Sequence, residues 1–109
     1  MTVQELAEKT GFSPVTGKGS LENTPEHIYT CDLLSLVMGR AQPNDVWITV
    51  MGNVNSVAVA VLADVACIIL AEGMALDAEA AKKAAEQDVA VLLSPLAVYE
   101  TAQRVAQYL

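Results

Sequence analysis

The stretch that decides the fold runs from Ile28 to Val50 and reads I-Y-T-C-D-L-L-S-L-V-M-G-R-A-Q-P-N-D-V-W-I-T-V. Val46–Val50 consists of residue types that favour strands. Leu33–Met38 is apolar nearly all round, which is typical of a short buried helix. Gln42–Asp45 lies between them and has the composition of a turn. The stretch therefore predicts a strand, a short helix, a turn and a second strand.

The same alternation of strand and helix continues along the chain. The run 54–62 is rich in Ala and Val and fits a strand as well as a helix. We expect a helix there, because the strands on either side would otherwise lack a crossover. The pattern predicts one α/β domain over residues 1–109, with a mainly parallel sheet of about five strands and helices on both faces. We expect strands at 12–16, 27–31, 46–50, 65–71 and 89–93, and helices at 3–10, 33–39, 54–62, 78–87 and 95–108.

Three of these helices begin with residues that commonly cap a helix. Thr2 and Glu5 have the spacing of a capping box. Asp32 precedes the helix at 33–39 and is expected to cap it, with Gly39 at its end. Ser94 is expected to cap the last helix, with Pro95 in its first position.

The composition points to extensive burial and to a soluble protein that does not bind nucleic acid. Hydrophobic residues make up 53% of the chain, so we expect both faces of the sheet to be covered and some apolar surface to be buried in a homodimer. The formal net charge is −7, and the six Lys and Arg residues are scattered. This distribution argues against binding to nucleic acid or to an anionic membrane surface.

Cysteine usage and hydropathy predict a cytoplasmic protein without a metal or cofactor. Cys31 and Cys67 have no neighbouring Cys or His that would complete a zinc site. Both fall in expected strands, where a free cysteine packs as a small apolar residue, although a redox pair remains an alternative. The chain opens without a signal-peptide pattern. Val54–Ala71 is strongly apolar, but Asp64 near its middle argues against a membrane helix.

Candidate ligand-binding residues follow the expected strands. Ligands of parallel sheets gather where the strands end at their carboxyl side. Gly52 and Asn53 at a helix start could hold a small anion on free backbone N–H groups, or they could form an ordinary turn and cap. Asp32 could orient a ligand instead of serving only as a cap. The candidate set is Asp32, Gly52, Asn53, Asn55 and Ser94.

Trp47 and Arg40 are candidates for an interface. Trp47 could pack in the core, fill a dimer contact or stack on a ligand ring. Arg40 could meet a phosphate, a carboxylate or an acidic partner chain. His27 is the only histidine, and no Ser/His/Asp set has a recognisable spacing. We therefore expect no catalytic residues.

The chain resembles the DRTGG domain family. The resemblance rests on I-Y-T-C-D-L-L-S-L-V-M-G-R-A, on D-V-W-I-T-V-x-G-N-V-N-x-V-A-V-A and on A-C-I-I-L-A-E-G. It is strongest for members that consist of this domain alone, and others are fused to HPr kinases, phosphotransacetylases and CBS-domain proteins. The motif for which the family is named is eroded here, because Glu22–Ile28, where we expect it, lacks the Arg and both glycines.

The resemblance implies an α/β sandwich that associates as a homodimer and has a regulatory role. We therefore expect a non-catalytic regulatory or ligand-sensing module that acts with a partner protein. The alternative is a binding protein for a nucleotide or a phosphorylated metabolite, with Asp32 and Gly52–Asn55 at its site.

Overall fold

Strand β3, Asp45–Thr49, shows how the sequence builds the domain. All five of its residues are buried, as expected of a strand covered on both faces. Its side chains alternate between the two faces of the sheet. Val46 and Ile48 belong to one hydrophobic cluster, and Trp47 belongs to the other. The computed structural model describes residues 1–109, which is the whole chain.

The five strands form one sheet in the order β1-β5-β4-β3-β2. The pairs β2–β3, β3–β4 and β4–β5 are parallel, and β1 pairs antiparallel with β5 at one edge. This confirms the prediction of a mainly parallel sheet. The other strands are β1 (Ser13–Thr16), β2 (His27–Thr30), β4 (Cys67–Leu70) and β5 (Val91–Leu93), and the helices are α1 (Val3–Thr10), α2 (Leu34–Arg40), α3 (Val54–Ala63), α4 (Ala78–Glu86) and α5 (Val98–Ala106), with a 3-10 turn η1 (Ser20–Glu22).

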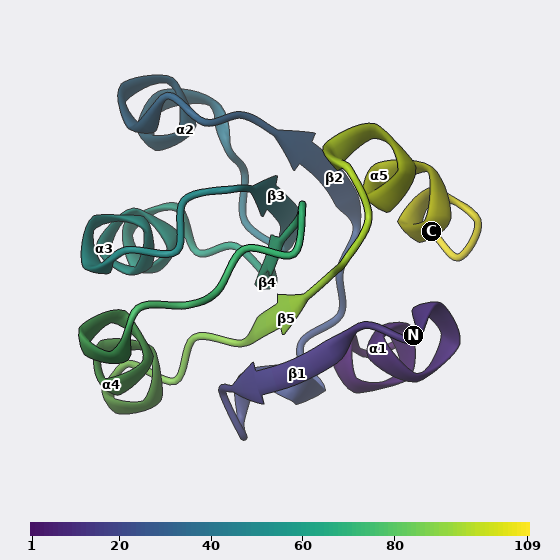
Figure 1. Cartoon of the computed structure of the whole chain (residues 1–109), viewed down its shortest axis with the longest axis horizontal. Coiled ribbons are helices and arrows are strands. Elements are labelled where there is room, and N and C mark those ends of the chain that lie inside the picture. Colours follow the sequence, from purple (N-terminus) through teal and green to yellow (C-terminus); the bar gives the residue numbers. More distant parts are fainter.

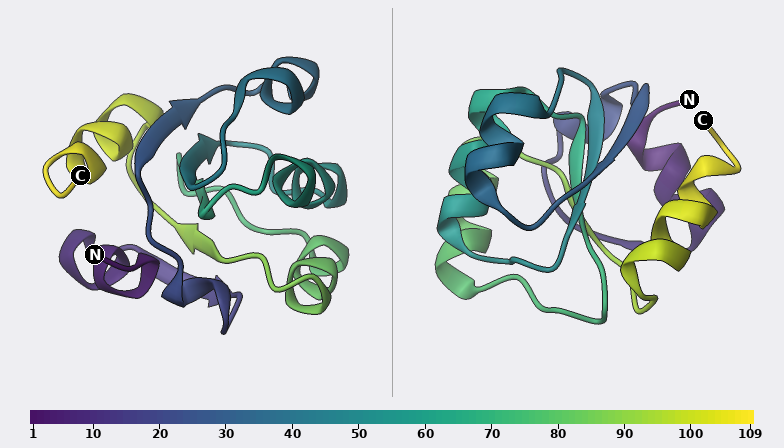
Figure 2. Two further views of the ribbon diagram at one scale, coloured as in Figure 1. Left: turned by 180° about the vertical axis from the view of Figure 1, so that it is seen from behind. Right: turned by 90° about the horizontal axis from the view of Figure 1, so that it is seen from above.

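Two helical layers cover the sheet, as the sequence predicts. Helices α2, α3 and α4 lie side by side on one face, and α1 and α5 lie on the other (Figures 1 and 2). The first layer encloses the cluster that contains Trp47, and the second encloses the cluster that contains Val3, Leu6 and Val105. None of these helices is both long and apolar enough to reach across a membrane.

The first and last helices meet through long-range contacts. Arg104 on α5 donates from Nη1 to the carbonyl oxygen of Thr10 at 3.2 Å. Its guanidinium also lies 5.9 Å from the centre of the Phe12 ring, within the range of a cation–π contact. Next to this clamp, Ser13 of β1 pairs with Leu93 of β5. The N-terminal segment is thus secured by residues close to the C-terminus.

The capping box at Thr2 is confirmed, and Asn53 follows the cap alternative. Thr2 and Glu5 form both hydrogen bonds of a capping box. The Thr2 backbone N–H donates to the Glu5 carboxylate and is the largest cause that lowers the pKa of Glu5 below its usual value. Asn53 accepts from the Ser56 backbone N–H at 3.0 Å and caps α3. The run 54–62 is therefore helical, as expected.

The other expected caps are wrong. Helix α2 begins at Leu34, and its N-cap position is Leu33, whose side chain makes no capping hydrogen bond. Gly39 lies inside the helix and does not end it. Helix α5 begins at Val98, and its N-cap position is Ala97. Asp32 and Ser94 instead make contacts outside these helix starts, as described below.

Candidate functional site

The candidate ligand residues lie along one edge of the sheet without converging. Asp32 follows β2, Asn53 follows β3 and Ser94 follows β5. In the sheet, β2 and β5 are separated by β3 and β4. With about 4.8 Å between neighbouring strands, Asp32 and Ser94 follow strands roughly 14 Å apart. The predicted residues share this edge of the sheet, but the edge does not gather them into one cluster.

Asp32 bridges two strand ends. Its Oδ1 atom accepts from the Thr49 hydroxyl at 2.7 Å and from the Val50 backbone N–H at 3.1 Å. Thr49 is fully buried, so Asp32 provides an acceptor for a hydroxyl that is shielded from water. The carboxylate thus joins the end of β2 to the end of β3. It does not cap α2.

The space beside the Gly52–Asn55 turn is occupied by other residues of the chain. A side chain on Gly52 would collide with the carbonyl oxygen of Ala75, so the glycine is needed where the loop after β4 passes closely. The Gly52 carbonyl oxygen accepts from the Asp77 N–H at 2.9 Å. Asn53 is engaged in capping α3, and Asn55 is exposed. This geometry matches the turn-and-cap interpretation of the segment.

Ser94 is buried and makes its hydrogen bonds within the chain. Its hydroxyl lies 2.8 Å from the Thr101 hydroxyl and accepts from the Leu96 N–H at 3.1 Å. Only 1% of the residue is exposed. The pair ties the end of β5 to the middle of α5, so Ser94 is a packing residue of the layer formed by α1 and α5.

A different part of this edge has the topology of a ligand crevice. After β4 the chain turns to α4 in one layer, whereas after β5 it turns to α5 in the other (Figure 2). Crevices in open α/β sheets form at such a switch. A groove of about 400 Å³ lies here. Its lining includes Gly11, Ser13, Gly73, Met74, Ser94 and Pro95.

Backbone contacts close the inner part of this crevice. The Glu72 N–H donates to the Leu96 carbonyl at 2.7 Å, and the Gly73 N–H donates to the Ser94 carbonyl at 3.0 Å. The Glu72 carboxylate accepts from the Val98 N–H at the start of α5 at 3.3 Å. Of these residues, only Ser94 is among the predicted ligand residues, because the switch depends on which layer each helix joins.

Comparison with known proteins identifies the family. The sequence model of the DRTGG domain matches residues 5–108. The chain belongs to the DRTGG domain family. No curated protein sequence matches it at a significant level. Glu22–Ile28, where we expect the name-giving motif, leads into the start of β2. It therefore lies at the opposite end of the parallel strands from Asp32, Asn53 and Ser94.

A solved structure has the same fold. It is the crystal structure of the CBS and DRTGG domains of the regulatory region of Clostridium perfringens pyrophosphatase, complexed with its activator diadenosine tetraphosphate. The TM-score is 0.79 and the sequence identity 11%, with 97% of this chain and 46% of the clostridial chain covered. This DRTGG domain therefore spans about half the length of that regulatory region, and the likeness concerns the fold alone.

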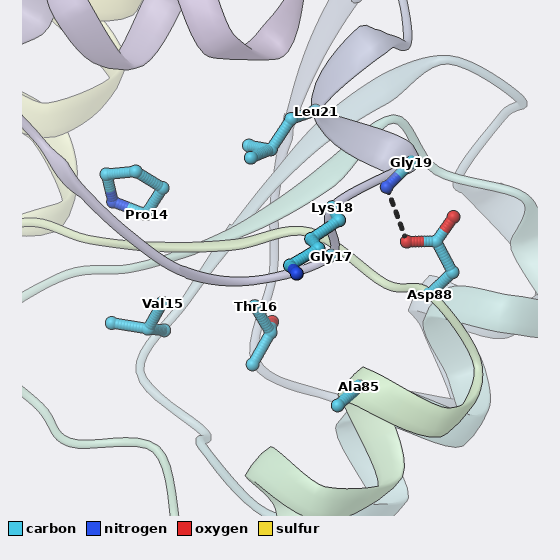
Figure 3. Close-up of a pocket in the computed structure, with 9 residues that line it drawn as sticks. All are labelled: Pro14, Val15, Thr16, Gly17, Lys18, Gly19, Leu21, Ala85 and Asp88. Carbon is cyan, nitrogen blue, oxygen red and sulfur yellow. Dashed lines mark hydrogen bonds between the residues drawn. The ribbon is translucent and has the colours of Figure 1, made fainter.

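The largest cavity of the DRTGG domain lies at the outer edge of β1 (Figure 3). It measures about 640 Å³ and is bordered by the loop that contains Gly17, Lys18 and Gly19. The Asp88 carboxylate accepts from the N–H groups of Gly19 and Ser20, at 3.0 and 3.2 Å. These two N–H groups are the ones that an anion would use, and the chain's own carboxylate already occupies them.

The interface candidates lie in different environments. Trp47 is fully buried, and its Nε1 donates to the Cys31 carbonyl at 3.0 Å. The prediction that Trp47 contributes to an interface is therefore wrong for this structure, since the single chain already encloses its side chain. Arg40 is exposed at the end of α2 and is available to a partner.

The two cysteines lie on opposite faces of the sheet. Cys31 is half-buried against the layer of α2, α3 and α4, whereas Cys67 is buried under α1 and α5. Burial raises the pKa of the Cys67 thiol to about 12, because the thiolate would lose its hydration. This separation argues against a redox pair. No three His, Cys, Asp or Glu side chains come together as a metal site would require.

Proposed function

We propose that this DRTGG domain is a regulatory module without an active site of its own, that it works as a homodimer, and that it passes its signal to a partner protein. The observation that carries this proposal is the amount of apolar side-chain surface left exposed by a chain with two complete cores. Leu62 is 71% exposed, Leu33 58% and Met38 53%. Exposed apolar residues that gather on one face are typical of protein–protein contacts.

The polar groups at the carboxyl edge support a non-catalytic role. The hydrogen bonds of Asp32, Asn53 and Ser94 go to groups within the chain. A general acid or base has to reach a substrate proton directly or through one water. His27, the only histidine, contacts Asp45 with 3.5 Å between Nδ1 and Oδ1, at the opposite edge of the sheet from Asp32. Similarity to a regulatory region of a pyrophosphatase is consistent with this role.

Light scattering after gel filtration tests the homodimer. We expect a molar mass near twice the 11.5 kDa of the chain at micromolar concentration. A mass of one chain that persists at a hundred-fold higher protein concentration would contradict self-association.

The groove at the switch between β4 and β5 supports a second candidate function, a sensor of a nucleotide or a phosphorylated metabolite. The clostridial regulatory region binds diadenosine tetraphosphate. The groove here is within the usual size range of ligand sites. None of its lining residues is Lys or Arg, so any phosphate would rely on backbone N–H groups.

Thermal shift with AMP, ATP and diadenosine tetraphosphate tests this second function. If the groove binds one of them, Met74→Asp should abolish the increase in melting temperature, because a carboxylate there repels phosphate. Tyr99→Asp places the same charge on α5 and serves as the control. An increase that survives in Met74→Asp would assign the ligand to another site, and no increase with any compound in the unmodified protein would count against this function.

A further inference from the structure

The outward side of α3 differs from that of every other helix longer than seven residues. Val54–Ala63 contains no charged residue, whereas α1, α4 and α5 all carry acidic and basic residues. A helix whose outer side meets water normally carries charge there. Residues Asn55, Ala58, Val61 and Leu62 form the exposed side of α3. Because α3 lies between α2 and α4 (Figure 1), the middle of this layer is apolar on the outside.

Exposed apolar side chains continue from α3 onto α2. Leu36 and Met38 of α2 are exposed, and so is Leu33 just before it. A groove of about 300 Å³ runs between α3 and α4 beside Val61 and Leu62. The layer therefore presents both projecting side chains and a depression. We call the set Leu33, Leu36, Met38, Ala58, Val61 and Leu62 the α2–α3 face.

We propose that the α2–α3 face is the contact between two copies of this chain, which pack on one another with each helix antiparallel to its mate. This inference rests on the proposed homodimer and names the surface that forms it. Asp32 precedes α2 and Arg40 ends it, and both are exposed. A two-fold axis that crosses the helices places Arg40 of each copy beside Asp32 of the other. The two ends of the face are thus complementary in charge to one another.

The size of the molecule also favours this face. A standard interface buries about 800 Å² on each partner. The domain measures 29 × 26 × 25 Å, so such an interface has to cover most of one side. The exposed side of α3 is apolar, and charged residues of α4 flank it: Glu79, Lys82 and Glu86 line a hollow with Val54, and Lys83 lines the groove beside Val61 and Leu62. This is the arrangement of an apolar interface core with a polar rim. The layer formed by α1 and α5 carries exposed charged residues instead, at Glu5, Glu8, Lys9, Glu100 and Arg104.

Substitutions with a matched control test the surface. Leu62→Glu places a charge on the α2–α3 face, whereas Tyr99→Glu places the same charge on α5. The two positions are matched in exposure, since Leu62 is 71% exposed and Tyr99 is 70% exposed. We expect Leu62→Glu to raise the dimer dissociation constant by about 100-fold, because the two-fold contact contains the new charge twice. Tyr99→Glu should leave the constant unchanged. Sedimentation equilibrium measures both, and circular dichroism confirms that each variant is folded.

Met38→Glu on α2 provides a second variant in case Leu62→Glu disturbs α3, and we expect it to weaken the dimer at least tenfold. If the protein is a dimer and both variants remain dimers with unchanged constants, the assignment of the surface is wrong and the proposed homodimer stands. If Tyr99→Glu dissociates the dimer, the contact lies on the layer of α1 and α5. A protein that is monomeric without any substitution removes the homodimer and this surface together.

Discussion

The two helical layers of this domain enclose similar cores and end in different surfaces. The layer of α1 and α5 has a buried apolar side and a charged outer side, as expected of helices that meet water. The layer of α2, α3 and α4 has an equally buried inner side, but the outer side of α3 has no charge. Burial within the chain accounts for the apolar residues of the first layer except Tyr99, which is exposed on α5 among charged neighbours. The second layer has apolar residues that one folded chain leaves exposed, as expected of a surface that contacts another chain.

The largest expected effect is a loss of unfolding free energy at two adjacent residues of β3, one under each helical layer. Trp47→Ala removes the largest side chain under α2, α3 and α4, and Ile48→Ala removes its neighbour under α1 and α5. Trp47→Ala should cost about 3–5 kcal/mol of unfolding free energy and Ile48→Ala about 2–5 kcal/mol. Urea unfolding measures both losses.

The same pair tests whether the layers differ in self-association. Trp47→Ala should also weaken the dimer, because it loosens the support of the α2–α3 face, whereas Ile48→Ala should leave the dissociation constant of the folded protein near its original value. Equal weakening by both variants would mean that the two layers contribute alike to the dimer.

Two glycines provide the next comparison. Gly17 has a φ angle of +86°, and a Cβ there would collide with the backbone of Ala90. Gly17→Ala should therefore destabilise the domain by about 1–3 kcal/mol from its backbone conformation alone. Gly39 lies in α2 with open space around it, so Gly39→Ala should stabilise the domain by about 0.5–1 kcal/mol. Thermal unfolding of both variants gives the signs, and a stabilised Gly17→Ala variant would disagree with the described loop.

A smaller effect tests the contact between β2 and β3. Asp32→Ala leaves the buried Thr49 hydroxyl without its acceptor and should cost about 1–2 kcal/mol. Asp32→Asn retains an oxygen in the same place and should lose less than half of that. If Asp32→Ala and Asp32→Asn unfold at the same urea concentration as the original protein, the carboxylate is not a structural bridge.

The smallest expected effect is a difference in alkylation rate between the two cysteines, one beside each helical layer. Burial holds the pKa of Cys67 at about 12, so its thiol stays protonated, and its thiolate does not form in the folded protein until the solution approaches that pH. Cys31 is half-buried. At pH 8 we expect iodoacetamide to modify Cys31 first, and Cys67 only as fast as the domain opens. Mass spectrometry of Cys31→Ser and Cys67→Ser variants measures each rate, and equal rates would contradict the burial of Cys67.

The sequence predicted the order of the elements because their signals are local. Val46–Val50 has strand-forming residues throughout, and the Asn53 cap and the Thr2–Glu5 box act within one turn of their helices. The errors at Asp32 and Ser94 have a common cause. Both have the residue type of a cap, but their hydrogen bonds reach Thr49 and Thr101, seventeen and seven residues away. Capping preferences consider only the following turn and do not include such competitors.

The candidate site was less predictable than the fold. Sequence order places Asp32, Gly52 and Ser94 at one edge of the sheet, and the structure agrees. The space in front of Gly52 is filled by Ala75, a residue that no local pattern links to it. The groove at the switch and the uncharged outer side of α3 depend on which layer each helix joins, so they become visible only once the chain is folded.

The antiparallel pairing of β1 with β5 has a consequence for the way this chain folds. Ser13 can pair only when Leu93 is present, so β1 cannot join the sheet until β5 has been synthesised. Until then, Val3, Leu6 and Phe12, all buried in the finished domain, lack their core partners from β5 and α5. Such long-range pairing slows folding and leaves apolar segments open to wrong contacts. During synthesis, these apolar side chains of the N-terminal segment therefore stay without their core partners until β5 and α5 have been made.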